Sequence, residues 1–402
     1  MLNGKHKLLA LSAVALSTMS FSAFAAPTHV IVAPQCLITQ AGVNAQTITT
    51  DKNMVLVKVN DSDIEKLSDA KHQTKTPCGG FVDVTDEWQT QQVRSLGSNS
   101  SAGFLASYTK PKKPASPQTY TIRYEAQANK LISQLNPQLM WDNLTKFSSS
   151  KDRYANSDNG VAAASWIKSQ VEEIAKAAGR DDVSVYFIDT PGYKQPSVVA
   201  KIGKGSGAGI VVGAHMDTTN SSFERKPGAD DDGSGSMTIM ESARTILSSG
   251  ATFKKPVYFI WYSAEELGLI GSKNVVSEFK KKKIPVDAVI HFDMTGYAYK
   301  NEKTIWLIDD NVDKNLTAYL EKIITTYTKR PVSYTRCGYG CSDHASWTKG
   351  GYTAAMPAES RFEDTNPSLH SSRDTIDKLS IEHMTDYAKI ATAFTVEMAE
   401  PA

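Results

Sequence analysis

Apolar and polar positions follow a regular order beyond about residue 160. Short apolar runs bounded by turn residues predict strands at 198–202, 209–214, 257–262, 288–292 and 304–308. Amphipathic stretches between and around these runs predict helices at 162–178, 235–248, 272–282, 315–327 and 380–398. Because strands alternate with helices, we expect an α/β fold with a mostly parallel sheet flanked by helices.

The residues before this region follow a different pattern. Apolar runs predict short strands at 29–33 and 54–59, followed by a short helix. Residues 107–118 then place three prolines among lysines, which disfavours both a helix and a strand. We therefore predict a small α+β domain at 26–106, a linker at 107–118 and a main domain at 119–402.

The N-terminus has the pattern of a secretory signal peptide. Lys5 and Lys7 precede an apolar stretch, and small residues at positions 23 and 25 provide a cleavage pattern. Several serines interrupt the stretch, which argues against a permanent membrane anchor. We therefore expect residues 1–25 to be removed and the protein to be secreted to the extracellular side through the periplasm.

Export gives the four cysteines a structural role, because disulfides form and persist in oxidising compartments. Four cysteines allow three different pairings. The division of the chain into two domains favours the local pairs. We expect Cys36 to pair with Cys78, and Cys337 with Cys341.

The charge balance bears on the kind of partner. The chain has 44 Lys and Arg residues against 43 Asp and Glu residues, a net charge of +1. Such a balance gives no basis for holding nucleic acid by bulk electrostatics. With 41% hydrophobic and 22% charged residues, the composition is that of a soluble globular protein without a membrane role once the signal is removed.

Three predicted strands run directly into side chains that can bind metals. His215 follows one strand, and Asp217, two residues on, can fix the tautomer of its ring. Asp293 follows another strand. Glu265 and Glu266 follow a third, and because adjacent glutamates in a loop diverge, one can bind a metal while the other takes a proton from water.

Two loops add candidates of the same kind. Residues 230–232 are three adjacent aspartates in a glycine-bounded loop, and they repel one another unless a cation collects them. A solvated acidic turn, with one aspartate capping a helix, is the alternative. His370 lies in a polar loop. Carboxylates and imidazoles in this mixture suit a pair of zinc-like ions better than calcium or a single structural zinc.

These residues fall into six motifs that follow one another in order. The motifs are His215-x-Asp217, Gly228-Ala229-Asp230-Asp231-Asp232, Ala264-Glu265-Glu266-Leu267-Gly268-Leu269-x-Gly271-Ser272, Asp293-Met294-Thr295, the segment from Cys337 to Trp347, and Asn366-Pro367-x-x-His370. From about Tyr120 to Met398 the chain thereby resembles the secreted bacterial zinc aminopeptidases of the M28 metallopeptidase family, of the leucyl aminopeptidase type.

The resemblance implies a fold and a cofactor. The fold is a twisted, mostly parallel sheet with helices on both faces and the site at the carboxyl ends of the strands. The cofactor is Zn²⁺, two ions per chain, with Asp231 bridging them. The other implied ligands are His215 and Asp293 on one zinc, and Glu266 and His370 on the second.

The resemblance also implies roles around the metals. Glu265 is the general base, Asp217 orients His215, and Tyr339 hydrogen-bonds the developing oxyanion. The peptide bond between Asp231 and Asp232 is often cis in the family. Peptides or small proteins with a free N-terminus are the implied substrates, and we expect a monomer.

The pocket for the substrate's first side chain follows from the same resemblance. Its matching wall positions are Met294, Ile308, Met356, Ala358, Phe362, Thr365 and Leu369. Close relatives usually carry aromatic residues where this chain has Ala358 and Thr365, so we expect a deeper or wider apolar pocket. The predicted preference is Leu, Phe or Tyr, with basic residues as the alternative if Glu363 or Asp364 reaches in.

Two other functions compete with the predicted aminopeptidase. A glutaminyl cyclase uses the same scaffold with one zinc, and a catalytically dead peptide-binding ectodomain would lack ligands or the base. Every expected position is present in this chain. Because all six motifs lie beyond Tyr120 and a basic segment precedes them, we also predict that residues from about 27 to the linker are a propeptide. A permanent accessory domain is the alternative.

Overall fold

The computed structural model of the chain describes Met1 and residues 28–71, 78–94, 100–109 and 119–402. The predicted signal peptide, Met1 apart, lies outside these residues, as does the predicted linker from residue 110 onward. Residues 107–109, which we expected in the linker, instead form the last turn of helix α4 (Ser101–Thr109). The first proline of that segment is Pro111, so none of these three residues interrupts the helix.

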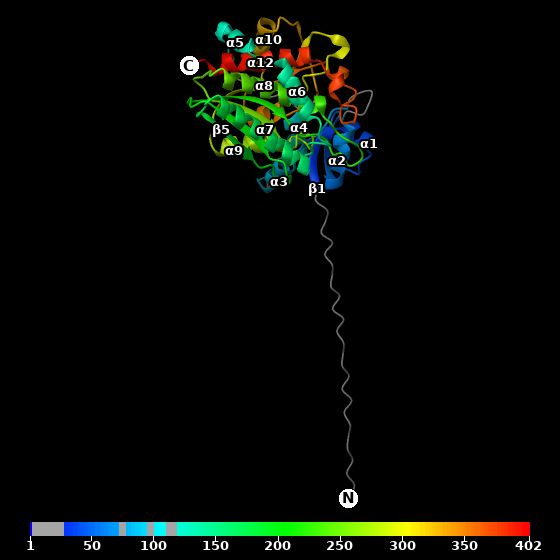
Figure 1. Cartoon of the computed structure of the whole chain (residues 1–402). Helices are drawn as coiled ribbons and strands as arrows, with labels where there is room; N and C mark the ends of the chain where they lie inside the picture. The colour runs from blue at the N-terminus through cyan, green and yellow to red at the C-terminus, as the bar shows by residue number, and fades with distance from the viewer. Residues whose placement is uncertain (2–27, 72–77, 95–99, 110–118) are drawn as a thin grey trace.

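A six-stranded sheet runs through the middle of the larger unit (Figure 1). Its strands, in spatial order, are β12 (Ala354–Ala355), β9 (Val286–His291), β7 (Gly209–His215), β8 (Val257–Tyr262), β6 (Ser197–Ile202) and β5 (Val183–Ile188). The first four are parallel, whereas β6 runs antiparallel to β8 and β5 antiparallel to β6. The expected mostly parallel sheet is confirmed.

Helices cover both faces of this sheet, because successive strand residues point to opposite sides. Val212 and Phe259 belong to the core on the side of α7 (Asp158–Ala177), α8 (Gly235–Ser248) and α12 (Ile381–Ala399). Their neighbours Val211 and Tyr258 belong to the core on the side of α9 (Ile270–Lys281) and α11 (His344–Gly350). The same first core also contains residues of α5 (Glu125–Ile132), α6 (Pro137–Phe147) and α10 (Lys314–Tyr327).

The strands that the apolar pattern did not predict are mostly short or lie at edges. A three-stranded sheet has the order β11 (Val332–Thr335), β10 (Ile305–Ile308) and β13 (Pro357–Ala358), and only β10 was expected. In the large sheet, β5 and β12 were also missed. Strands of two to six residues at an edge are defined by their pairing more than by an apolar run.

In its described residues, the N-terminal unit is an antiparallel sheet with four helices. The sheet order is β2 (Gln46–Asp51), β3 (Met54–Asn60), β1 (Thr28–Pro34) and β4 (Val82–Asp83). The helices are α1 (Gln35–Ala41), α2 (Asp61–Ala70), α3 (Thr85–Arg94) and α4. A disulfide joins Cys36 to Cys78, as the local pairing predicted.

This small unit packs directly on the larger one, as the blue segment beside it shows (Figure 1). Leu37 and Leu67 share a buried core with Ala264 and Leu267 of the larger unit. A second shared core joins Val32, Leu56 and Val84 of the small unit with Leu269 and Tyr339 of the larger one. The small unit therefore completes its own core with residues taken from the motifs that carry the candidate chemistry.

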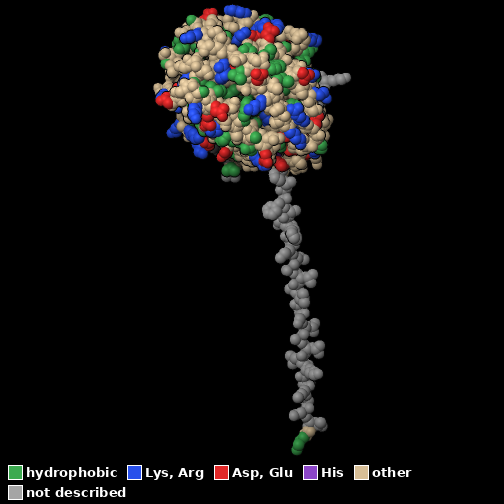
Figure 2. Space-filling view, in the orientation of Figure 1, with side chains coloured by type: hydrophobic (Ala, Val, Ile, Leu, Met, Phe, Trp, Pro, Cys, Tyr) green, Lys and Arg blue, Asp and Glu red, His purple; other side chains and the backbone are tan. Residues whose placement is uncertain are grey.

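The surface carries charges of both signs. Blue and red side chains spread over the visible face of the molecule (Figure 2). This distribution agrees with the net charge of +1. Within the described ranges, no helix is both long enough and apolar enough to cross a membrane.

Candidate active site

Five side chains with metal-ligand chemistry meet at one edge of the large sheet. His215 is the last residue of β7, and Asp293 follows the end of β9 by two residues. Glu266 lies in the loop after β8, Asp231 lies just before α8, and His370 lies in the loop before α12. The carboxyl ends of parallel strands meet at the same edge of a sheet, so residues far apart in sequence become neighbours.

Asp231 lies between two halves of this group. Its Oδ1 is 3.1 Å from His215 Nε2, and its Oδ2 is 3.0 Å from His370 Nε2. Asp293 Oδ1 is 3.6 Å from the same nitrogen of His215, and Glu266 Oε1 is 2.9 Å from that of His370. None of the five residues is more than 6% exposed. Two buried clusters therefore share one carboxylate.

These donors fit divalent metal ions. Two ligands of a tetrahedral zinc, each about 2.0–2.1 Å from the metal, lie roughly 3.3 Å apart, and the separations above scatter around that value. Within the described residues, both nitrogens of His215, both carboxylate oxygens of Glu266 and Asp293 Oδ1 are buried and make ion-pair contacts but no hydrogen bond of good geometry. Such atoms cost free energy unless an ion or water satisfies them. The residues present therefore suit a pair of zinc ions.

The electrostatics of the site also favour bound cations. Burial lowers the pKa of His215, but Asp293, Asp217 and Asp231 outweigh burial and raise this pKa well above its ordinary value. Burial also lowers the pKa of His370, and Glu266 and Asp231 raise it to about 10. The surrounding carboxylates thus favour positive charge at the two histidines, which is the charge that bound cations would supply.

Asp232 lies within reach of His215 and Asp293 but holds backbone groups. Its Oδ2 accepts the N–H of His215 at 3.1 Å, and its Oδ1 accepts the N–H groups of Gly235 and Met294 at 2.9 and 3.0 Å. Both oxygens are occupied, so this carboxylate orients the loops around the clusters. The peptide bond between Asp231 and Asp232 is cis, as the resemblance implied.

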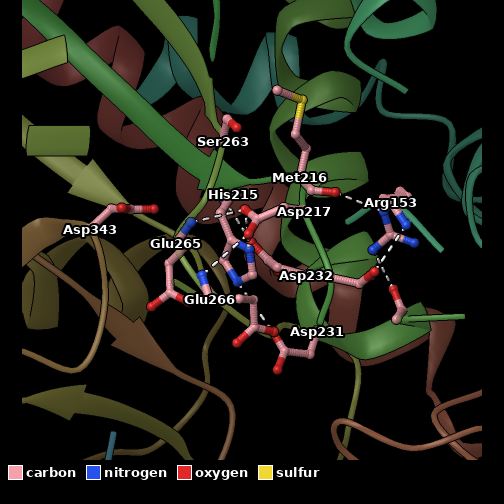
Figure 3. A network of polar contacts seen from close by, with 12 residues as sticks. Arg153, His215, Met216, Asp217, Asp231, Asp232, Ser263, Glu265, Glu266 and Asp343 are labelled. Carbon is pink, nitrogen blue, oxygen red and sulfur yellow. Dashed lines mark hydrogen bonds and ion pairs between the residues drawn. The ribbon is translucent and has the colours of Figure 1, made fainter. Parts of the chain in front are cut away.

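Asp217 ties three parts of the site together (Figure 3). Its Oδ1 lies 3.4 Å from His215 Nδ1 and accepts the N–H of Glu265 at 3.1 Å. Its Oδ2 accepts the N–H of Glu266 at 3.2 Å. One fully buried carboxylate therefore orients the ring of His215 and fixes the backbone from which both glutamates project.

Glu265 lies beside the two clusters and faces a lysine of the N-terminal unit. Lys71 Nζ is 3.2 Å from Glu265 Oε2 and 3.6 Å from Glu266 Oε2. Burial raises the pKa of Glu265 well above its ordinary value, although Lys71 and His215 oppose this rise. Lys71 is itself only 8% exposed, so the contact is a buried ion pair between the two units.

The N-terminal unit covers the site at two further points. The carbonyl oxygen of Ser68, in α2, accepts a hydrogen bond from His370 Nδ1 at 2.8 Å. The ring of Tyr339 packs on Gly79, where a Cβ would lie 2.6 Å from a ring carbon. Only glycine permits this approach. With Lys71, these contacts put the end of α2 and the segment around Gly79 directly over the candidate ligands.

Tyr339 lies in a loop that the disulfide between Cys337 and Cys341 closes. Asp310 holds the start of this loop by accepting two backbone N–H groups, that of Cys337 at 3.1 Å and that of the next residue at 2.7 Å. Asn311 Nδ2 donates to the carbonyl of Tyr339 at 2.9 Å. Burial raises the pKa of the Tyr339 phenol, so its hydroxyl stays protonated and able to donate at neutral pH.

A small apolar pocket opens beside the clusters. Asp231, Asp293 and Tyr339 contribute to it. Six of the seven predicted wall residues line it, namely Met294, Ile308, Met356, Ala358, Phe362 and Thr365. Leu369, the seventh, is buried but does not line this pocket.

The carboxylates near this pocket differ from those that the sequence indicated. Glu363 is exposed, and Asp364 forms an ion pair with Arg361 at 2.7 Å, so neither lines the pocket. Glu359 does line it and accepts the N–H of Tyr297 at 2.7 Å. Burial, aided by Asp230, raises the pKa of Glu359 well above its ordinary value, which favours an uncharged side chain.

Several residues of the site escaped the sequence analysis. They are Ser68, Lys71, Asp310 and Glu359, together with Arg153 and Asp374, which hydrogen-bond the backbone next to His215 and Asp231. Each acts through a contact with a segment distant in the chain; Lys71 and Glu265, for example, are 194 residues apart. No local pattern in the sequence signals such contacts.

Comparison with known proteins adds the family. Residues 197–395 match Peptidase family M28. Leucine aminopeptidase 1 of Aspergillus fumigatus is 34% identical over 97% of this chain and 98% of its own length. Two solved structures from Legionella pneumophila, each with a TM-score of 0.84 and covering 93% of this chain, are similar throughout. The LapA aminopeptidase is 42% identical with 99% of its chain covered, and LapB is 38% identical with 100% covered.

These likenesses extend over both units of the chain. The related proteins come from a fungus and a bacterium, so a secreted bacterial origin stays a prediction. Their identity and coverage, together with the matched family region, establish the class of enzyme. The chain belongs to peptidase family M28 and is a metallo-aminopeptidase, a hydrolase of peptide bonds.

Proposed function

We propose that this enzyme is a secreted di-zinc aminopeptidase that removes the N-terminal residue from peptides and small proteins. The observation that carries the proposal is the carboxylate of Asp231, which contacts His215 on one side and His370 on the other. His215 and Asp293 would hold one zinc, Glu266 and His370 the second, and Asp231 would bridge them.

The residues around the metals divide the chemical work. A bound zinc pair supplies Lewis-acid polarisation of the scissile carbonyl and makes water a better nucleophile at neutral pH. Glu265 takes a proton from the attacking water and returns it to the leaving amine. Asp217 keeps Glu265 in place through its backbone N–H. Tyr339 donates a hydrogen bond to the oxygen on which negative charge develops.

The contacts of Lys71 support recognition of a free N-terminus. A primary ammonium group, that of Lys71, is accommodated next to Glu265 and Glu266 in the structure. The α-ammonium of a peptide would meet the same carboxylates once Lys71 had left. A peptide with an acetylated N-terminus lacks this charge and should not be cleaved.

The pocket supports a neutral first residue, and we propose Leu, Phe or Tyr. Five of its predicted wall residues are apolar, and small side chains stand at Ala358 and Thr365. Glu359 carries the one buried carboxyl group that we find among the lining residues outside the clusters, and burial raises its pKa, which favours the neutral form. A preference for Lys or Arg is the second candidate, because a cationic substrate would favour the ionised form of Glu359.

We also propose that the N-terminal unit is a propeptide that keeps the enzyme latent. Lys71 engages the proposed general base, and Ser68 engages the proposed ligand His370. The segment around Gly79 packs on Tyr339. A substrate cannot occupy the space that these groups fill, so cleavage and release of the N-terminal unit would have to precede full activity.

The competing functions make different demands on the site. A glutaminyl cyclase expects one zinc per chain, whereas the described residues provide two clusters of possible ligands. A peptide-binding module without activity does not require Glu265 beside those clusters. Both ligand clusters and the adjacent glutamate therefore favour the aminopeptidase.

The test is hydrolysis of a leucyl chromogenic amide by the matured enzyme. A chelator should abolish turnover, and zinc should restore it with two ions bound per chain. Glu265→Gln should keep both zinc ions while kcat falls by about 10²–10⁴-fold, the usual contribution of a general base. Glu266→Gln is the matched variant and should lose zinc. Normal turnover by a fully metallated Glu265→Gln enzyme would contradict the assignment of the base.

A further inference from the structure

An arginine lies completely buried beside the candidate site (Figure 3). Arg153, just before α7, donates from Nε to the carbonyl of Met216 at 2.8 Å. Its Nη1 donates to the carbonyl of Pro227 at 2.6 Å, and its Nη2 donates to that of Gly228 at 2.7 Å. Burial lowers the pKa of Arg153 to about 10, so the guanidinium is still charged at neutral pH.

The three carbonyl groups belong to two segments that carry proposed metal ligands. Met216 lies between His215 and Asp217, whereas Pro227 and Gly228 begin the loop that leads to Asp231. A guanidinium is planar and its donors form a rigid fork, so it sets the distance between the segments that it bonds. Arg153 therefore spans the gap between the His215 segment and the Asp231 loop.

The backbone at Gly228 leaves little freedom on the Arg153 side. Gly228 has a φ of +52°, which favours glycine. A Cβ at this position would lie 2.4 Å from the carbonyl oxygen of Asp231 and 2.8 Å from Arg153 Nη2. Arg153, Gly228 and the backbone of Asp231 are thus packed so closely that no side chain larger than glycine fits at position 228.

Asp374 holds the same loop at its other end. Its Oδ1 accepts the N–H of Asp230 at 3.0 Å, and its Oδ2 accepts the N–H of Asp231 at 3.1 Å. Asp374 is 1% exposed and is the foremost of the charges that stabilise the charged form of Arg153. Burial raises the pKa of Asp374 itself well above its ordinary value. A buried guanidinium and a buried carboxyl group therefore hold the loop that presents Asp231.

We infer that Arg153 and Asp374 are positioning residues for the metal centre, which set the placement of Asp231 relative to His215. The inference rests on the proposed di-zinc function. Stability alone is a weak reason for burying two such polar side chains, because apolar residues of similar volume often stabilise a fold at least as well. The pattern of contacts supplies the better reason, since both residues bond the backbone on either side of proposed ligands.

Zinc binding by the full-length chain tests this role without using activity. Arg153→Lys keeps the charge, but one ammonium cannot bond three carbonyls in a fixed plane. Asp374→Asn replaces one acceptor by an N–H donor that faces another N–H. Residues that orient metal ligands usually contribute about 10–100-fold to metal affinity, so we expect a loss of that size for at least one zinc in each variant. Competition with a chromogenic chelator measures it, and the absorption spectrum of the Co²⁺ form should change as well.

Arg180→Lys is the matched control. Arg180 follows the opposite end of α7, its side chain is 8% exposed, and it donates to the carbonyl of Ala251 at 3.0 Å and to Asp182 at 2.6 Å. Replacing this buried arginine should lower the melting temperature. Zinc affinity and the Co²⁺ spectrum should remain those of the wild type.

Each outcome separates this inference from the proposed function. A wild-type chain that binds fewer than two zinc ions contradicts the di-zinc function itself. Two zinc ions in the wild type, with unchanged affinity and Co²⁺ spectrum in the folded variants, overturn only the positioning role. If Arg153→Lys fails to fold, the zinc affinity and Co²⁺ spectrum of the folded Asp374→Asn variant decide between the two outcomes. If neither variant folds, the pair serves general stability and the positioning role is wrong.

Discussion

Buried carboxylates at the active site fall into two groups according to what their oxygens contact. Asp217, Asp232 and Asp374 each accept at least two backbone N–H groups. Among the described residues, buried oxygens of Asp293 and Glu266 make ion-pair contacts with the histidines but no hydrogen bond of good geometry. Carboxylates of the first group build the loops, and those of the second are available to cations. The three adjacent aspartates at 230–232 look alike by residue type. The resemblance singles out Asp231, and the contacts with backbone N–H groups put Asp232 in the first group.

Tyr339→Phe tests the proposed hydrogen bond to the oxyanion. Removing one such donor typically costs about 10²–10³-fold in kcat, so we expect a loss of that size with KM little changed. Steady-state kinetics of the matured enzyme on a leucyl amide measures both constants. Tyr334→Phe is the control, because Tyr334 is 45% exposed and donates to Glu321, away from the site. Equal kcat values for Tyr339→Phe and the wild type would remove Tyr339 from the mechanism.

Ala358→Phe and Thr365→Tyr test which residues set the size of the pocket. Each puts an aromatic ring where this chain has a small side chain, so the space for the substrate's first residue should shrink. We expect kcat/KM for Phe and Tyr amides to fall by about tenfold or more relative to an Ala amide, since one methylene in such a pocket is worth about 1–3 kcal/mol. Glu363→Gln, at an exposed position, should change nothing. A wild-type enzyme that prefers the Lys amide by a wide margin would contradict the neutral pocket.

Among whole elements, those with a long periodic pattern were predictable from the sequence and short paired ones were not. Helix α8 occupies 235–248 as predicted, and β8 occupies 257–262. Helix α7 begins four residues before the predicted start, at Asp158, because Ser157 accepts the N–H of Gly160 as its cap. Strands β12 and β13 have two residues each, too few for any apolar pattern. Pairing with β9 and β10 defines them, and pairing is a tertiary property.

The placement of three candidate ligands was predictable for the same reason. His215, Glu266 and Asp293 each follow a predicted strand, and parallel strands bring their carboxyl ends together. Asp231 and His370 lie in loops, and the resemblance singled them out. The residues that act from another part of the chain were not predictable. Lys71 follows α2 in the N-terminal unit, and nothing in its local sequence indicates a contact with Glu265. Arg153 lies in an irregular segment before α7, where a charged residue is ordinarily exposed.

At the level of the small sheet, His29 should make the stability of the N-terminal unit depend on pH. His29 Nδ1 bonds Asp83 at 2.6 Å and Nε2 bonds Asp61 at 3.1 Å, and the bond with Asp83 is the main reason that the pKa of His29 is raised. The stabilisation is therefore complete below the unfolded pKa of about 6.5 and is lost as pH rises through the folded pKa. Because the histidine is partly exposed, we expect about 1 kcal/mol.

Urea unfolding of the full chain at pH 6 and pH 9 measures this effect. His29→Gln should lower the free energy of unfolding at pH 6 and leave it nearly unchanged at pH 9. Comparing the variant with the wild type at each pH cancels the other titrating groups. An equal loss at both pH values would mean that the contribution of His29 does not depend on its charge.

In the whole molecule, the N-terminal unit covers the candidate active site of the larger unit. The N-terminal unit shares its two buried cores with Leu267 and Leu269, which lie in the segment directly after Glu265 and Glu266. Separating the units would expose these leucines and leave Glu265 without Lys71. Docking and the proposed latency would therefore depend on the same contacts, and a change that weakens docking should raise activity in the uncut chain.

Lys71→Met tests this coupling in the uncleaved protein. Removing the ammonium leaves buried carboxylates without their partner, which should weaken docking by roughly 1.4 kcal/mol or more and raise the residual activity about tenfold. Lys66→Met is the control, because the side chain of Lys66, in the helix that Lys71 follows, is 58% exposed and pairs only with Asp63 within the described residues. Cleavage within residues 110–118 and release of the N-terminal unit should then bring wild type and Lys71→Met to the same activity.

The most active secreted form should begin near residue 119, and N-terminal sequencing measures this. A fully active form that starts near residue 27 would show that the N-terminal unit is a permanent domain and that Lys71 moves aside without maturation.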